Sequence, residues 1–205
     1  MGCLHGVGIV FGNTAPHNTQ NLTETASALG ATILTALEAS KATYLVAGNV
    51  LRLPDGSDPY ITSIQANPKL IVVSTEWLSA CQAEEWKVPA SSYLLSPFSG
   101  IKVSITNFGA RERDAVVLQL KQGKANYSPE LFRHTTHLVG NRPGGNKYTH
   151  AREWGLFIVH HDWVLDCLKV GHRLDERSYN IDTYTPRVTS AAPLASGGDH
   201  QRHPS

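Results

Sequence analysis

The chain has 205 residues, of which 41% are hydrophobic and 17% charged, and its formal net charge is +1. This composition supports a packed core, argues against a largely disordered chain and excludes a global basic field for nucleic acid. It contains no run near the roughly 20 apolar residues of a membrane span, and its three cysteines, without a Cys-x-x-Cys pair, favour a reducing compartment.

The charges are unevenly placed along the chain. Residues 1–100 have a balance of −3, residues 101–147 a balance of +5, with eight basic and three acidic side chains, and residues 148–205 a balance of −1. An anion site is therefore best sought in the middle segment.

The predicted elements alternate between strands and helices in chain order. In the first half, apolar runs and helical periodicity predict strands and helices at Val7–Phe11, Thr23–Leu29, Tyr44–Ala47, Tyr60–Ala66 and Leu70–Val73, followed by a helix that carries Trp77 and Cys81. In the second half they predict elements at Ile101–Thr106, Ala110–Gln122, Lys124–Tyr127, Thr136–Val139, Lys147–Trp154, Leu156–Val159 and Asp162–Val170. Strands that alternate with helices indicate parallel sheets covered by helices on both faces.

The chain contains an internal repeat. A Trp-x-x-x-Cys pattern occurs at Trp77 with Cys81 and at Trp163 with Cys167. Upstream, Thr-Tyr-Leu-Val at residues 43–46 matches Thr-His-Leu-Val at residues 136–139, and we match Gly30 to Gly123. The upstream landmarks are offset by 93 residues and the tryptophans by 86, which predicts a longer loop around residues 48–58 in the first copy, with a Pro-Asp-Gly turn at residues 54–56.

These landmarks divide the chain into four parts. Residues 4–86 form repeat 1 and residues 101–182 repeat 2. Residues 87–100 have loop composition and are predicted to be the linker between the repeats. Residues 183–205 are rich in Ser, Thr, Pro, Ala and Gly without periodicity, which predicts a disordered tail.

Both copies resemble the BRCT family over roughly residues 4–182. The resemblance is carried by the glycine turn after the first helix, the Thr-His-Leu-Val strand and the apolar strand that leads into Trp-x-x-x-Cys. Repeat 2 is the closer match: residues 145–154 look like the second-helix signature of phosphate-reading repeats, and residues 158–167 and 171–179 resemble the PAX-interacting-protein and topoisomerase-binding scaffold families. The resemblance implies an α/β fold of two tandem BRCT repeats, each a four-stranded parallel sheet flanked by three helices.

The resemblance also implies a phosphate pocket in repeat 2. Family pockets use a hydroxyl at the end of the first strand, the next backbone N–H, a Lys at the start of the second helix and, in many members, a basic residue early in the first helix. Here the matching residues are Thr106, Asn107, Lys147 and Arg113, with Arg111 a weaker substitute for Arg113. These groups suit the charge and acceptor oxygens of a phosphorylated side chain. One departure is Asn107, which stands where family pockets often have Gly.

Repeat 1 lacks this set of residues. Its first strand ends in Phe11-Gly12 without a hydroxyl, and no Lys or Arg lies between Leu53 and Pro68. Repeat 1 is therefore expected to be structural or to bind partners through another surface.

Each candidate residue also has an ordinary interpretation. Lys147 could be a solvated helix residue, Thr106 could merely end a strand, and Arg113 could belong to a salt-bridged surface turn. The residues interpreted as structural core are Trp77, Cys81, Trp163, Cys167, Gly30 and Gly123.

Metal, cofactor and catalytic sites are not expected. His134 with His137 and His160 with His161 lack a Cys or carboxylate that would complete a metal site. The chain has neither a Gly-x-Gly-x-x-Gly nor a Walker loop nor a Gly-x-Ser-x-Gly elbow.

The leading hypothesis is therefore a non-enzymatic adaptor that binds phosphorylated protein partners in the DNA-damage response or in chromatin regulation. Two alternatives stay open: a BRCT scaffold that binds unmodified protein, and binding of DNA ends or backbone through the basic segment 101–147. No membrane contact is expected, the chain is expected to be a monomer or part of a larger scaffold, and the resemblance implies a nuclear location.

Overall fold

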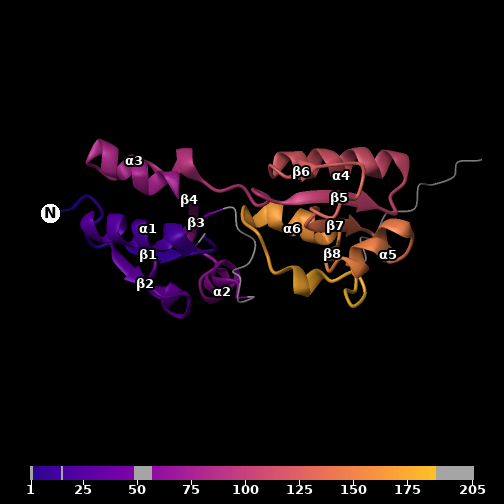
Figure 1. Ribbon diagram of the computed structural model, residues 1–205, viewed down its shortest axis with the longest axis horizontal. Coiled ribbons are helices and arrows are strands. Elements are labelled where there is room, and N and C mark those ends of the chain that lie inside the picture. Colours follow the sequence, from indigo (N-terminus) through magenta and orange to yellow (C-terminus); the bar gives the residue numbers. More distant parts are fainter. Residues whose placement is uncertain (1, 15, 49–56, 188–205) are drawn as a thin grey trace, which may run out of the picture.

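Two similar units lie side by side along the long axis of the molecule (Figure 1). The computed structural model describes residues 2–14, 16–48 and 57–187; most of the loop predicted around residues 48–58, including its Pro-Asp-Gly turn, lies outside them. Repeat 1 contains β1 (Gly8–Phe11), α1 (Pro16–Ala28), β2 (Thr32–Leu34), the 3-10 helix η1 (Ala36–Lys41), β3 (Tyr44–Ala47), α2 (Pro59–Ala66), β4 (Ile71–Ser74) and α3 (Glu76–Glu84).

Repeat 2 has the same order of elements. It contains β5 (Lys102–Thr106), α4 (Ala110–Gln122), β6 (Asn126–Tyr127), β7 (His137–Gly140), α5 (Asn146–Glu153), β8 (Phe157–His160), α6 (Asp162–Val170) and the 3-10 helix η3 (Glu176–Tyr179). The two sheets have the orders β2-β1-β3-β4 and β6-β5-β7-β8, and every pair of neighbouring strands is parallel. The predicted fold class, two four-stranded parallel sheets with three helices each, is confirmed.

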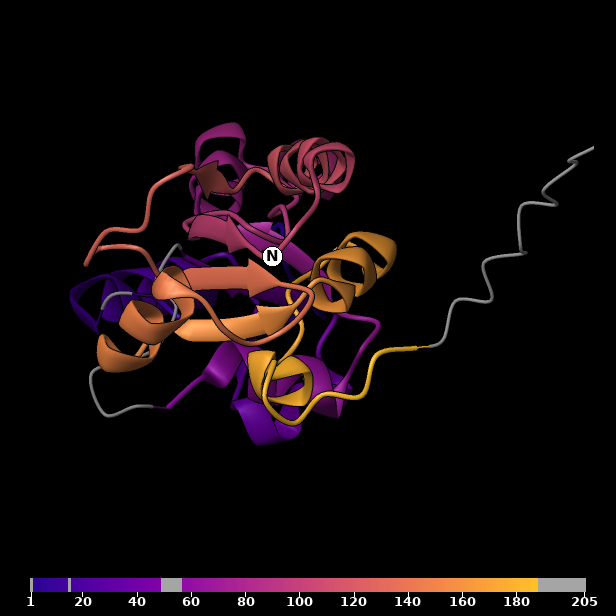
Figure 2. The same ribbon diagram turned by 90° about the vertical axis from the view of Figure 1, so that its right-hand side faces the viewer.

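Helices cover both faces of each sheet. Viewed from the repeat 2 end, α4 and α6 lie on one side of the strands and α5 on the other (Figure 2). Because both faces are covered, all residues of the central strands β3 and β7 are buried. Trp77, Cys81, Trp163 and Cys167 are fully buried in the cores where the sequence placed them.

Each core tryptophan fixes the segment that follows its helix. Trp77 Nε1 donates to Val88 O at 3.1 Å, and Trp163 Nε1 donates to Leu174 O at 2.9 Å. Those segments then return across the sheet edges, where antiparallel bridges join Val73 to Leu94 and Val159 to Asn180. The exposed edges of β4 and β8 are thereby paired, which protects them from pairing with other chains.

The linker, residues 87–100, is packed rather than loose. It contains the 3-10 helix η2 (Ala90–Tyr93). Val88 packs in the core of repeat 1, whereas Phe98 packs in the core of repeat 2 with its ring 5.1 Å from that of Trp163. Burial of these two side chains ties the linker to both repeats.

The match between Gly30 and Gly123 is shifted by one residue. Gly8 pairs with Thr32 in repeat 1, and the equivalent Lys102 pairs with Asn126 in repeat 2. Gly30 and Lys124 each lie two residues before these partners, so Lys124 is the counterpart of Gly30. Both have positive φ, 87° for Gly30 and 62° for Lys124, whereas Gly123 is not in the left-handed region. Gly123 is needed for a different reason, because a Cβ there would lie 2.1 Å from the Phe98 ring.

The start of the predicted tail contacts repeat 2. The Tyr184 hydroxyl donates to Asp162 at 2.9 Å, its ring stacks on His160, and Arg187 pairs with Asp166. Residues 183–187 therefore extend the packed domain, and residues 188–205 lie outside the described residues.

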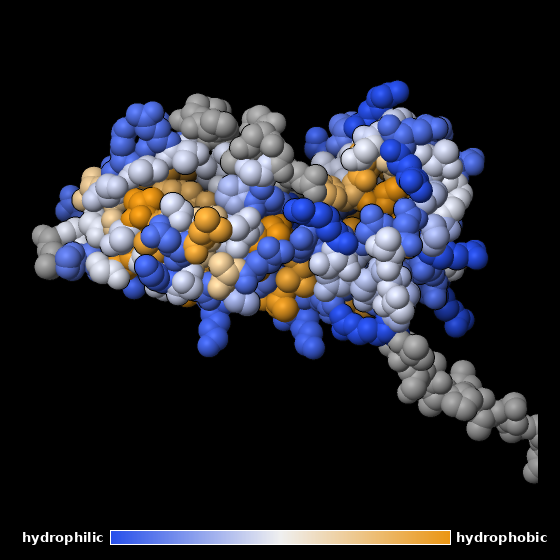
Figure 3. All heavy atoms as spheres, turned by 90° about the horizontal axis from the view of Figure 1, so that it is seen from below, coloured by the Kyte–Doolittle hydropathy of each residue, from blue (hydrophilic) through white to orange (hydrophobic). Residues whose placement is uncertain are grey.

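On the face seen from below, apolar side chains lie in separate patches among hydrophilic ones (Figure 3). Across the described segments, none of the helices combines the length and apolar character that crossing a membrane requires.

Candidate anion-binding site

A hollow of about 530 Å³ lies where β5 ends and α4 and α5 begin. Its lining residues are Ile105, Thr106, Asn107, Phe108, Arg113, Asn146 and Lys147. All four residues predicted for the pocket are among them, although 41 positions separate Thr106 from Lys147. Arg111, the weaker substitute, is exposed and does not line the hollow.

Lys147 is anchored at the end of the sheet. Its Nζ donates to Ser104 Oγ at 3.0 Å, to Ile105 O at 3.1 Å and to Pro129 O. Partial burial and the nearby positive charge of Arg113 lower the pKa of Lys147, whereas Glu130 acts in the opposite direction. The side chain is therefore held by the fold rather than free in solvent.

Two cations share this hollow without a carboxylate partner. Within the described part of the chain, neither Arg113 nor Lys147 forms an ion pair. Glu112, the neighbour of Arg113, instead accepts a hydrogen bond from Gly109 N at the start of α4. Like charges held near one another favour the binding of an anion between them.

Asn107 shows how the chain dispenses with the glycine of family pockets. Its φ is 61°, in the left-handed region, which Asn tolerates better than most residues. Its Nδ2 donates to Arg142 O and Gly144 O, both at 2.9 Å. The amide thus holds the glycine-rich loop before α5, beside the nearly buried Thr106.

The corresponding place in repeat 1 has different residues. The strand registers of the two sheets make Gly12 and Asn13 of repeat 1 equivalent to Thr106 and Asn107 of repeat 2. Tyr60 is the second residue of α2, and Lys147 is the second residue of α5. Repeat 1 thus has Gly12 where repeat 2 has the Thr106 hydroxyl, and Tyr60 where repeat 2 has Lys147.

In repeat 1, a side chain of repeat 2 lies at the position that corresponds to the phosphate pocket. Asp58, which precedes α2, accepts hydrogen bonds from Asn13 Nδ2 at 2.7 Å and from Ile61 N at 3.1 Å. Arg173 of repeat 2 donates through Nη2 to both Asp58 oxygens, at 3.1 and 3.0 Å, and its guanidinium lies 4.9 Å from the Tyr60 ring centroid. An internal ion pair thus stands where an external anion would be expected.

Arg173 also joins this ion pair to the core of repeat 2. Its Nη1 lies 3.5 Å from Glu176, which lies 3.3 Å from His137 Nε2, and all three side chains are buried. Burial raises the pKa of Glu176, but the His137 hydrogen bond and the Arg173 charge outweigh it and leave that pKa lowered. The sequence analysis did not predict this network, because the sequence alone assigns no role to Arg173 or Glu176.

The buried Tyr60 hydroxyl gives this interface a pH dependence. It accepts a hydrogen bond from Arg173 N at 3.2 Å, and burial raises its pKa to about 12. Because the unfolded tyrosine ionises near pH 10, the neutral native side chain stabilises the fold fully below pH 10, and that contribution is lost between pH 10 and about 12. Urea unfolding measures the free energy of unfolding at pH 9 and at pH 11. We expect this free energy to fall less between the two pH values in Tyr60→Phe than in the wild type; equal falls would contradict this assignment.

The fold and sequence can be compared with known proteins. Residues 101–163 match the sequence family described as twin BRCT domain. The crystal structure of Rad4 BRCT1,2 in complex with a Crb2 phosphopeptide superposes with a TM-score of 0.74 at 21% identity, covering 88% of this chain and 100% of the other. The chain has the tandem BRCT fold. The complex of Rad4 BRCT1,2 with a Mdb1 phosphopeptide gives 0.71 at 21% identity, over 86% and 97% of the two chains.

Several curated proteins are similar to this chain in sequence. The S-M checkpoint control protein rad4 of Schizosaccharomyces pombe is 23% identical over 71% of this tandem BRCT chain. PAX-interacting protein 1 is 30% identical over 55% of the chain in Danio rerio and 29% identical over 72% in Bos taurus. The chain spans 23%, 13% and 15% of the lengths of these three relatives, respectively.

BRCT repeat 2 contains pocket residues that sequence matching did not single out. Phe108 and Asn146 line the hollow, and Ser104, fully buried, accepts the Lys147 hydrogen bond. Phe108 and Asn146 directly follow or precede predicted pocket residues, so their place was a weak signal in the sequence. Ser104 was concealed because a hydroxyl inside a core strand carries no signal by itself.

Proposed function

We propose that this tandem BRCT chain is a phosphopeptide-binding adaptor whose phosphate pocket lies in repeat 2. The observation that carries the proposal is the convergence of Arg113, Lys147 and the Thr106 hydroxyl on one hollow, with neither cation in an ion pair among the described residues. The similar Rad4 modules were crystallised with phosphopeptides, which supports the same ligand class here.

The chemistry of the pocket suits a phosphate monoester. A phosphorylated Ser or Thr carries about −1.5 to −2 charges and three acceptor oxygens. Thr106, the N–H of Asn107, Arg113 and Lys147 supply donors for them. Hydrogen bonds to charged groups contribute about 1.5–3 kcal/mol each, so three or four supply much of the roughly 8 kcal/mol of a micromolar complex.

Binding of phosphate alters the contacts of Lys147. Its ammonium has three N–H groups, and three oxygens already accept from it. We expect the phosphate to replace the exposed Pro129 carbonyl, because Ser104 and Ile105 are buried in β5 and cannot move away without breaking the sheet.

The module takes one phosphate per chain in this proposal. In repeat 1, Arg173 and Asp58 fill the corresponding place, and Tyr60 replaces the Lys. A doubly phosphorylated partner therefore contributes only one of its two phosphates to a pocket of this kind.

The relatives suggest the setting of this activity. A checkpoint control protein and PAX-interacting protein 1 are among them, and we therefore place the adaptor in the DNA-damage response or chromatin regulation, in the nucleus, without a catalytic role. Its partners are phosphorylated proteins.

Lys147→Glu tests the proposal. With the wild type, phosphorylated peptide libraries should bind and unphosphorylated ones should not, as measured by fluorescence polarisation. The substitution should reduce phosphopeptide affinity by at least about tenfold, since it removes a charge-assisted hydrogen bond and adds a repelling charge.

Arg111→Glu is the matched control. It makes the same change of charge two residues before Arg113, at an exposed position outside the hollow, and should retain most of the affinity. Equal binding of both libraries would instead support a phosphorylation-independent scaffold. Duplex DNA binding with a steep salt dependence, unaffected by Lys147→Glu, would support the DNA hypothesis.

A further inference from the structure

A second hollow, of about 550 Å³, lies between the two repeats and is not part of the phosphate pocket. It opens at the carboxyl ends of the repeat 1 strands, where Thr14, Gly48 and Ser74 line it, and the linker and Lys124 close its other side. Ligands of open parallel sheets bind outside the carboxyl ends of the strands, and this volume lies within the usual range of ligand pockets.

The lining of this hollow is mainly polar. Hydroxyl and amide groups come from Thr14, Asn18, Ser74, Thr75, Ser92 and Ser99. Such groups hydrogen-bond to a peptide backbone or to polar side chains, and they offer little to an apolar ligand. An adjoining hollow of about 220 Å³ shares Asn18, Thr75 and Glu76, so the space continues between α1 and α3.

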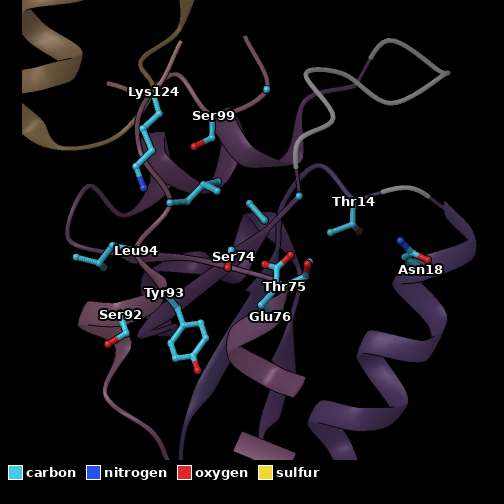
Figure 4. Close-up of a pocket in the computed structure, with 14 residues that line it drawn as sticks. Thr14, Asn18, Ser74, Thr75, Glu76, Ser92, Tyr93, Leu94, Ser99 and Lys124 are labelled. Atoms are coloured by element: carbon cyan, nitrogen blue, oxygen red, sulfur yellow. The ribbon is translucent and has the colours of Figure 1, made fainter. Parts of the chain in front are cut away.

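Two opposite charges face this space from different repeats. In Figure 4 the Lys124 side chain extends into the space from the repeat 2 side, and the Glu76 carboxylate points into it from the opposite side, beside Ser74 and Thr75. Neither residue forms an ion pair with any residue that the structure describes. Hydrogen bonding to Ser74 and to its own backbone N–H lowers the pKa of Glu76 and keeps it ionised.

Lys124 occupies a backbone position that does not suit a lysine. Its φ of 62° lies in the left-handed region, where the counterpart in repeat 1 is Gly30. A side chain held in this conformation costs on the order of 1 kcal/mol or more. The position nevertheless holds a lysine, which is the one basic side chain among the described residues of the lining.

We propose that this hollow is a phosphate-independent binding site for an extended, unphosphorylated segment of a partner protein that carries one basic and one acidic side chain. The basic side chain pairs with Glu76 and the acidic one with Lys124, while the hydroxyl groups between them bind the backbone. The site gives repeat 1 and the linker a binding role that does not depend on the pocket of repeat 2.

Charge exchange tests the site. The probes are fluorescent twelve-residue peptides of Gly, Ser and Ala with one Arg and one Asp, one to six residues apart, in both orders. Wild type should bind a subset of spacings and prefer one order. Glu76→Gln and Lys124→Gln should each weaken that binding about tenfold, and the double variant Glu76→Lys with Lys124→Glu should prefer the reverse order.

Controls separate this site from general charge effects and from the phosphate pocket. Glu84→Gln alters a charge at the other end of the helix that begins with Glu76, and Lys121→Gln alters a charge in the helix that ends just before Lys124; both residues lie outside the lining. These variants should leave affinity unchanged, as should Lys147→Glu. Lys124→Gly should weaken peptide binding while raising Tm by about 2–4 °C, because it relieves the left-handed strain.

Failure of every peptide to bind the wild type, or binding that the Glu76 and Lys124 variants leave unchanged, would overturn the proposal. A fall in Tm for Lys124→Gly would show instead that Lys124 is kept for structural reasons, and would also count against it. None of these results bears on phosphopeptide binding, which Lys147→Glu tests separately.

Discussion

Arg173→Ala is expected to lower the free energy of unfolding by about 3–5 kcal/mol, the usual effect of removing one partner from a buried ion pair. The variant leaves the Asp58 carboxylate buried between the repeats without its cation, and it also removes the positive charge beside Glu176. Urea unfolding at neutral pH, followed by tryptophan fluorescence, measures the loss.

Arg177→Ala is the matched control for this prediction. Arg177 pairs with Asp175 at 3.3 Å, but its side chain is 71% exposed, and such pairs contribute only about 0–1 kcal/mol. We further expect Asp58→Asn combined with Arg173→Ala to cost less than the sum of the single variants, because the two residues share one network. Equal effects of Arg173→Ala and Arg177→Ala would show that the interface does not depend on this ion pair.

Trp163→Ala is expected to lower the free energy of unfolding by about 3–5 kcal/mol, as for other buried aromatic residues. The ring is fully buried and packs against Phe98 from the linker and against His137, with both pairs of ring centroids 5.1 Å apart. The substitution therefore leaves a cavity where the linker meets the core of repeat 2.

The Trp163 indole also supports the interface between the repeats. Its Nε1 holds the carbonyl of Leu174, the residue after Arg173. Trp163→Phe, which retains most of the ring but loses this hydrogen bond, should cost much less than Trp163→Ala, yet its effect should not add fully to that of Arg173→Ala. Full additivity, measured by urea unfolding, would contradict coupling between the core and the ion pair.

Local signals identified most of the elements, with differences at their ends. The bounds of α4 and α6 agree with the sequence prediction, and glycine stands directly before and after α4 and directly after α6, where it favours a helix end. Helix α1 begins at Pro16, well before the predicted Thr23. The prediction placed the start too late because the first two turns of the helix are polar and show no apolar periodicity. Pro at a first helical position is favourable, so Pro16 is the local signal for this start.

The pocket in repeat 2 could be proposed from the sequence through the resemblance to BRCT repeats, whose phosphate-binding positions these residues match. Thr106 ends a strand and Lys147 begins a helix, and parallel topology brings the carboxyl ends of strands and the starts of the following helices to one edge of the sheet. The anchoring of Lys147 on Ser104 and Pro129 could not be predicted, because it depends on how a loop folds back over that edge.

The sequence by itself determined the duplication, the two parallel sheets and the buried tryptophans, since apolar periodicity and local motifs depend on neighbours along the chain. The candidate phosphate residues came from the resemblance to BRCT repeats. Only the tertiary structure decided that Arg173 meets Asp58 across 115 positions and that Lys124 and Glu76 line the same hollow. Pairing of isolated charges depends on the relative placement of the repeats, and no periodic pattern in the chain records that placement.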